Sequence, residues 1–222
     1  MDYSFDFAVV FSRFDALLYG CLLTLQLSAG AIVLSLVIAI AAVALMQARI
    51  SPAIKVINGF VEVVRNTPFL VQIFFIYFGL PSMGVRFDPN IAALIALGIN
   101  GAAYSIEIIR AGVEAIPKGQ LEAGVALGLK RSQIFRYIII KPALRTIYPA
   151  LTSQFIFLML TSSIASSITA NELTHVGAAI EGETFRSFEV YFIVAVLYLA
   201  MSFLMSLMFR AIAQINFSYP VK

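Results

Sequence analysis

The sequence has 222 residues, of which 61% are hydrophobic and only 12% are charged, and its mean hydropathy is +0.94. A soluble domain carries about twice this share of charged residues, so the composition excludes a soluble globular protein. The formal net charge of +3 reflects basic residues that flank apolar stretches, and we predict no nucleic-acid partner from it. The single cysteine, Cys21, excludes a disulfide framework within the chain.

Five long apolar stretches follow one another along the chain, separated by polar segments. A helix needs about 20 predominantly apolar residues to cross the hydrocarbon core of a bilayer. We therefore predict an all-α, multi-pass membrane protein with about five transmembrane helices in one domain over residues 1–222. The predicted spans cover residues 17–46, 54–80, 90–112, 146–168 and 189–211, and a cytoplasmic loop covers about residues 113–145.

Basic residues are distributed unevenly between the segments that join the spans. If the amino terminus lies outside, twelve Lys and Arg residues fall on the cytoplasmic side and three, Arg13, Arg86 and Arg186, on the outer side. Cytoplasmic segments carry the excess of basic residues, so we expect the amino terminus outside and the carboxyl terminus in the cytoplasm. The acidic start of the chain, with no basic segment before the first span, predicts that this span is retained rather than cleaved as a signal peptide.

The second predicted span is interrupted. It carries Glu62 and Arg65, then Asn66-Thr67-Pro68, and becomes cleanly apolar only from Phe69 onward. Proline removes a backbone hydrogen bond, so we expect a kink or a break at Pro68. Broken helices in transporters offer freed backbone groups to a solute. Arg65, Asn66, Thr67 and Pro68 are therefore candidates for the solute path or a gate.

The third predicted span ends in charged residues. Glu107 and Arg110 are three residues apart, and Arg110 and Glu114 are four apart, so each pair can meet on one helix face. One interpretation is interfacial side chains with local ion pairs. The other is a cytoplasmic gate whose ion pairs re-form between helices, and it makes Tyr104, Glu107 and Arg110 candidate gate residues.

The segment between the third and fourth spans is the longest polar interval in the sequence. Pro117 suits the first turn of a helix, and Gly128 suits the left-handed residue that ends one. Leu121 and Val125 give that helix an apolar face. A second amphipathic piece follows, and we expect it to end at Pro142.

Two interpretations of this pair of helices stay open. The small residues Ala123 and Gly124 would let another protein surface approach closely, and Glu122 would fix its direction, which makes the loop a docking element. Alternatively, the pair lies on anionic lipid headgroups as an ordinary amphipathic segment.

Hydroxyl side chains are concentrated in the fourth predicted span, where Thr161, Ser162 and Ser163 stand together. Inside a helix such hydroxyls can bond to carbonyl groups one turn earlier. Their density alternatively indicates a wettable path for a zwitterionic solute, or a tight helix interface. We include the three residues among the candidates for the solute path.

The cytoplasmic loop resembles the EAA loop in the membrane subunits of bacterial ATP-binding-cassette (ABC) importers. Glu122-Ala123-Gly124 is followed after three residues by Gly128 and, after nine more, by Ile138. Other segments, in the same order, are similar to the branch of that family that imports polar amino acids. They are Tyr19-Gly20 with Thr24-Leu25-Gln26-Leu27-Ser28, Val64-Arg65-Asn66-Thr67-Pro68-Phe69-Leu70, Tyr104-Ser105-Ile106-Glu107-Ile108-Ile109-Arg110-Ala111-Gly112, Ile116-Pro117-Lys118-Gly119-Gln120 and Thr184-Phe185-Arg186-Ser187-Phe188-Glu189.

This resemblance implies the permease subunit of a type I ABC importer in the bacterial cytoplasmic (inner) membrane, which moves a polar amino acid by alternating access. It implies three kinds of partner: a dimer of ABC ATPase subunits, a second permease chain that is identical or related, and a periplasmic or extracellular amino-acid-binding protein that docks on the acidic outer segment. The loop residues implied to contact the ATPase are Glu122, Ala123, Gly124, Gly128, Lys130 and Arg131.

Two positions depart from the family pattern. Gly124 stands where the family usually has alanine, a change between small residues that should preserve docking. Leu160-Thr161 stands where many relatives carry Lys followed by Asp or Asn, so the substrate contacts of those relatives do not transfer to this chain.

The sequence offers no chemistry for ATP hydrolysis. It has no phosphate-binding loop of the form G-x-x-x-x-G-K-[ST], so we expect no enzyme activity in this chain. The single histidine, His175, has no cysteine near it in the sequence, and we expect neither a metal site nor a cofactor. A self-contained secondary transporter or channel is the alternative function, although such proteins are often built from internal repeats. A membrane scaffold would leave the charged residues of the third span unexplained.

Overall fold

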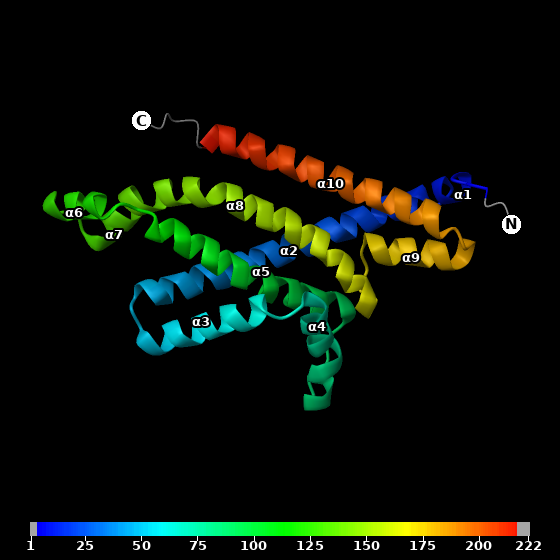
Figure 1. Ribbon diagram of the computed structural model, residues 1–222, viewed down its shortest axis with the longest axis horizontal. Helices are drawn as coiled ribbons and strands as arrows, with labels where there is room; N and C mark the ends of the chain where they lie inside the picture. Colours follow the sequence, from blue (N-terminus) through cyan, green and yellow to red (C-terminus); the bar gives the residue numbers. More distant parts are fainter. Residues whose placement is uncertain (1–3, 217–222) are drawn as a thin grey trace.

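The computed structural model describes residues 4–216, apart from the side chains of Lys118, Arg131, Phe135 and Lys141. All regular structure in this part of the chain is helical, and the long helices run roughly along one axis (Figure 1). The elements are α1 (Ala8–Phe11), α2 (Phe14–Gln47), α3 (Ser51–Arg65), α4 (Phe69–Phe74), π-helix η1 (Phe75–Gly79), 3₁₀-helix η2 (Leu80–Met83), α5 (Pro89–Glu114), α6 (Lys118–Ala126), α7 (Arg131–Gln133), π-helix η3 (Ile134–Ile139), α8 (Ile140–Thr161), 3₁₀-helix η4 (Ser162–Ile168), α9 (Leu173–Thr184) and α10 (Ser187–Asn216).

The prediction of an all-α, multi-pass membrane protein is confirmed. Four helical stretches among the described residues are long and apolar enough to cross a bilayer: Phe14–Gln47, Pro89–Glu114, Pro142–Ile168 and Ser187–Asn216. A bent pair of helices brings the number to five if it is one span. Large apolar side chains on the outside, such as Val33 and Val37 of α2 and Phe203 and Leu204 of α10, are exposed and suit contact with acyl chains.

The bent pair is broken at the expected proline. Ser51–Arg65 and Phe69–Met83 meet at 107°, so the second piece runs across the axis of the long helices (Figure 1). Pro68 has an extended backbone, with φ −62° and ψ 137°, and has no N–H to continue the ladder of α3. The interruption is therefore a full break, and α3 and α4 do not form one straight rod.

Helix α5 lies at the centre of the bundle and packs against α2, α3 and α8. Small residues permit this packing: a Cβ at Gly98 would lie 2.4 Å from Leu34 Cδ2, and one at Gly101 would lie 3.1 Å from Ser35 Cβ. Lipid tails are as apolar as a helix surface, so membrane helices associate through close packing of this kind. The packing of α2 against α5 therefore fixes the position of the charged end of α5.

The loop that was predicted to be cytoplasmic contains the two predicted helical pieces, but the second does not end at Pro142. Residues from Arg131 to Thr161 form α7, η3 and α8 without interruption. Pro142 is the third residue of α8. Its missing N–H falls where the π-helix η3 passes directly into α8, at the change from π-helical to α-helical hydrogen bonding, and the helix continues past it.

The acidic segment that was predicted to lie outside is also more ordered than a connecting loop, because it contains α9, which packs against α2 and α10. A Cβ at Gly20 of α2 would lie 3.1 Å from Leu173 Cα, so glycine at this position allows the two helices to touch. Helices α1 and α9 lie at one end of the long axis, and α6 lies at the other, together with the end of α10 (Figure 1). Which end faces the cytoplasm stays a prediction.

Candidate functional site

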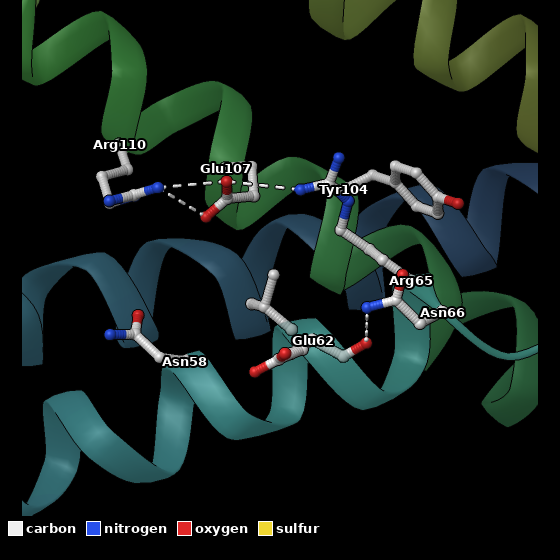
Figure 2. A pocket seen from close by; sticks show the side chains of 8 residues that line it. Asn58, Glu62, Arg65, Asn66, Tyr104, Glu107 and Arg110 are labelled. Atoms are coloured by element: carbon white, nitrogen blue, oxygen red, sulfur yellow. Dashed lines mark hydrogen bonds and ion pairs between the residues drawn. The ribbon is translucent and has the colours of Figure 1, made fainter.

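A pocket of about 470 Å³ lies between α3 and α5, beside the helix break (Figure 2). Its walls hold two arginines and two glutamates, so both signs of charge face the same space. The lining residues are Asn58, Val61, Glu62, Arg65, Asn66, Tyr104, Glu107 and Arg110.

Glu107 is the centre of the charged network. Its Oε2 atom lies 3.3 Å from Nη1 of Arg65 on α3, and its Oε1 atom lies 3.0 Å from Nη2 of Arg110 on α5. Arg110 also lies 3.8 Å from Glu114, and the Arg65 guanidinium lies 5.4 Å from the centre of the Tyr104 ring. One carboxylate therefore links two helices, as Figure 2 shows.

The pairing of Arg65 differs from the arrangement that sequence spacing favours. Arg65 and Glu62 are three residues apart on α3, yet Arg65 contacts Glu107 across the pocket instead. Glu62 forms no ion pair with any of the described side chains and lies in the pocket wall. An ion pair between helices is the arrangement that the gate hypothesis requires.

The carbonyl groups freed at the break are occupied by side chains, contrary to the expectation that they face a solute. Val64 O would accept from the N–H of residue 68 in a continuous helix, and proline has none. Gln72 Nε2 donates to Val64 O at 2.7 Å in its place, and Thr67 Oγ1 donates to Val63 O at 2.9 Å. Gln72 is held in turn by Asn100 of α5, whose Nδ2 donates to Gln72 Oε1 at 3.1 Å.

The structure divides the candidate residues of the solute path into two groups. Arg65, Asn66, Tyr104, Glu107 and Arg110 line the pocket together. Outside this lining are Thr67, which caps the break, and Pro68, which causes it.

The hydroxyls of the fourth span lie elsewhere and are hydrogen-bonded within their own helix. Thr161, Ser162 and Ser163 donate to Phe157 O, Met159 O and Leu160 O at 2.8, 2.6 and 2.8 Å. The three hydroxyls therefore bond to backbone carbonyls about one turn earlier, which was the first of the two interpretations. A place in a solute path stays a prediction for these three residues.

The loop residues of the predicted docking element are mostly exposed. Glu122, Ala123 and Lys130 are exposed, whereas only the backbone of Arg131 is described. Gly128 ends α6 with φ +73°, and the next residue, Leu129, donates its N–H to Gly124 O at 3.1 Å. This is the glycine-terminated helix end that the sequence predicted.

Gly124 is buried and packs against η3. A Cβ there would lie 2.5 Å from Ile138 Cδ1 and 3.2 Å from Ile134 Cγ1, so the surface that approaches it belongs to η3 of the same chain. The small residue lets α6 fold back on η3. On the other side of α6, Val125 is 66% exposed, and just past its end Leu127 is 77% exposed.

Two acidic residues of the segment that was predicted to lie outside are fully buried, which sequence reasoning missed. Glu172 caps α9 by accepting from Thr174 N at 2.9 Å and His175 N at 2.6 Å, and Tyr198 of α10 donates to it at 2.6 Å. Burial raises the pKa of Glu172, and the hydrogen bonds from Tyr198 and these N–H groups oppose the rise. Glu189 accepts from Asp6 N at 2.9 Å. The surface of this segment therefore exposes fewer carboxylates than its sequence indicates.

Polar residues in otherwise apolar helices were the available signal for the other missed residues. Gln72 and Asn100 stand alone in apolar surroundings, and Asn58 lies one turn before Glu62. A side-chain amide inside a membrane span needs a hydrogen-bond partner within the protein, because lipid tails offer none. The sequence does not say which partner it finds.

Comparison with known proteins places the chain in a family. The family model described as "binding-protein-dependent transport system inner membrane component" matches residues 31–215. The glutamine transport system permease protein of Escherichia coli is 37% identical over 212 residues, covering 93% of this chain and 95% of that protein. The octopine transport system permease protein of Rhizobium radiobacter is 34% identical, covering 92% of this chain and 87% of that protein.

Solved structures agree. A chain of an amino acid ABC transporter crystallised with histidines matches with a TM-score of 0.89 at 33% identity, covering 96% of this chain and 99% of that one. A chain of the inward-facing methionine ABC transporter MetNI has a TM-score of 0.76 at 21% identity, which shows the shared fold. The chain therefore belongs to the family of binding-protein-dependent transport system inner membrane components, the permease subunits of ABC importers.

Proposed function

We propose that this chain is the translocation subunit of an ATP-driven importer and carries a polar amino acid across the cytoplasmic membrane by alternating access. The two relatives described above are named for octopine and glutamine transport. They are 34% and 37% identical to this chain, and each match covers more than 85% of both proteins. The pocket between α3 and α5 suits such a zwitterionic solute, since Arg65 and Arg110 can attract a carboxylate and Glu62 an ammonium group. ATP hydrolysis belongs to a separate subunit.

The observation that carries the proposal is the exposed surface of α6. Helix α6 lies at one extreme end of the molecule (Figure 1). Val125 in α6 and Leu127 just past its end stay 66% and 77% exposed, and Glu122 in the same helix is also exposed. Apolar side chains beside a charge, on a short helix that is fixed by a glycine end and by η3, suit a groove on another protein. We assign that groove to the ATPase subunit.

The remaining partners follow from the same proposal. A second permease chain, identical or related, completes the pore, and an external binding protein delivers the amino acid at the α9 end. The Arg65–Glu107 pair acts as a gate on the α6 side, because movement of α3 relative to α5 makes or breaks it.

Replacement of Glu122 by Lys tests the docking surface. We expect Glu122→Lys to be inserted in the membrane normally, to lose the ATPase during purification in mild detergent, and to abolish uptake into proteoliposomes. Asp15→Lys is the matched control, because Asp15 is also exposed and lies at the opposite end of the chain. Asp15→Lys should retain the ATPase. Full uptake by Glu122→Lys, or uptake by the permease alone with an ion gradient and no ATP, would refute the proposal.

A further inference from the structure

A second pocket, of about 310 Å³, lies between α8 and α10 at the end of the bundle where α6 is found. The two helices are joined there by Tyr148, whose hydroxyl donates to Phe209 O at 2.8 Å. The pocket is lined by Tyr148, Pro149, Thr152, Ser153, Ile156, Ser206, Phe209, Arg210 and Ala213.

Three hydrogen-bond donors in this lining have no partner in the described part of the chain. They are the guanidinium group of Arg210 and the hydroxyls of Ser153 and Ser206; most other hydroxyls of these helices donate to a carbonyl one turn earlier. No carboxylate stands among the lining residues to neutralise Arg210. A positive charge with two free hydroxyls is a set of donors that suits a phosphate group.

The α10 side of the pocket becomes apolar with distance from the α6 end of the bundle. On α10, the stripe from Arg210 through Ser206 continues to Phe203 and Leu199, which are 60% and 70% exposed. The helix rises about 16 Å over the eleven steps from Leu199 to Arg210, close to one leaflet of a core of about 30 Å.

We propose that this pocket binds the phosphate of an anionic phospholipid, with the acyl chains lying along Phe203 and Leu199. Arg210 and the two serine hydroxyls hold the phosphate, and the exposed apolar stripe of α10 matches the lipid tails in direction and length. An anionic lipid is favoured over a zwitterionic one because the lining offers no carboxylate for an ammonium group. Basic pockets between membrane helices recognise anionic headgroups in this way.

Native mass spectrometry of the full purified chain tests the site, with phosphatidylglycerol, phosphatidylcholine of the same acyl chains, and inorganic phosphate as probes. We expect phosphatidylglycerol to bind best and Arg210→Gln to weaken its binding about fivefold. Ser153→Ala with Ser206→Ala should weaken it as well, by removing neutral donors without changing the net charge. Arg86→Gln, which removes an exposed arginine without an ion pair at a distant loop, is the matched control and should bind normally.

Four results would overturn the assignment. They are unchanged binding by Arg210→Gln, an equal loss in Arg86→Gln, equal binding of phosphatidylcholine, and displacement of the lipid by inorganic phosphate, which would make the site one for free phosphate. A disulfide formed between two copies that carry Ser206→Cys in the membrane would also count against it, because the pocket would then be covered by a second chain.

Discussion

Glu107 holds two guanidinium groups, one from its own helix and one from α3. The side chains of Arg65 and Glu107 are 43% and 30% exposed, so their ion pair is accessible to water. Pairs of this kind contribute roughly 0.2–1 kcal/mol. A contact this weak can break and re-form during a transport cycle, which fits a gate better than a structural clamp.

A double-mutant cycle measures whether this pair acts as a unit. We expect Arg65→Gln and Glu107→Gln each to slow uptake, and the double variant to be no slower than the slower single variant, since either change already breaks the contact. The measurement is uptake into proteoliposomes that contain the assembled importer. The control combines Arg65→Gln with Glu62→Gln. Those two residues do not form an ion pair with each other, so their separate effects on the uptake rate should multiply. Multiplying effects in the Arg65–Glu107 cycle would contradict a shared role.

The break between α3 and α4 is an element whose shape depends on more than its proline. Pro68 removes the donor for Val64 O, but Gln72 supplies another, and Asn100 of the neighbouring helix orients Gln72. Without Gln72 the carbonyl would have to find water or shift. The 107° bend is thus stabilised by a side chain four residues beyond the proline and by a contact with α5.

Replacement of Gln72 by Leu removes the donor that replaces the missing N–H. We expect Gln72→Leu to lower the stability of the detergent-solubilised protein by about 1–3 kcal/mol, the cost of an unsatisfied buried polar group. Asn100→Ala should cost less, because Val64 O keeps its donor. Thermal unfolding measures both. Gln26→Leu makes the same change at an exposed glutamine of α2 without a hydrogen bond and should leave stability unchanged; a similar loss there would show that the effect is unrelated to the break.

Across the whole molecule, helices α1 and α9 lie at one end and α6 lies at the other (Figure 1). Most arginine and lysine residues fall in the segments that were predicted to be cytoplasmic, and these segments include α6. We therefore expect the α6 end of the molecule to face the cytoplasm. The docking surface on α6, the gate and the proposed lipid site all depend on that direction.

Cysteine labelling in intact cells tests the orientation. In a Cys21→Ser background, Ser4→Cys should react with a membrane-impermeant thiol reagent added outside, and Ser132→Cys should react only after the membrane is permeabilised. Both positions are exposed and lie near opposite ends of the molecule. The reverse labelling pattern would show that the chain is inserted the other way round.

Several features could be predicted from the sequence because they depend on neighbouring residues. Long apolar stretches determine the membrane class, Pro68 determines a break, and Gly128 determines the end of α6, since each acts within one or two helical turns. The resemblance to ABC importer permeases rested on short motifs of the same local kind. Pro142 was the local prediction that was wrong, because the helix continues past it where the π-helix η3 passes into α8, and the sequence does not show this change of hydrogen-bond pattern.

Only the tertiary structure decided which polar groups meet. Arg65 and Glu107 are 42 residues apart in the chain, and Asn100 and Gln72 are 28 apart, so no helical spacing relates them. The burial of Glu172 likewise depends on Tyr198, which approaches from another helix. Amphipathic patterns show which residues share a face of one helix, but the packing of small residues between helices determines which faces come together.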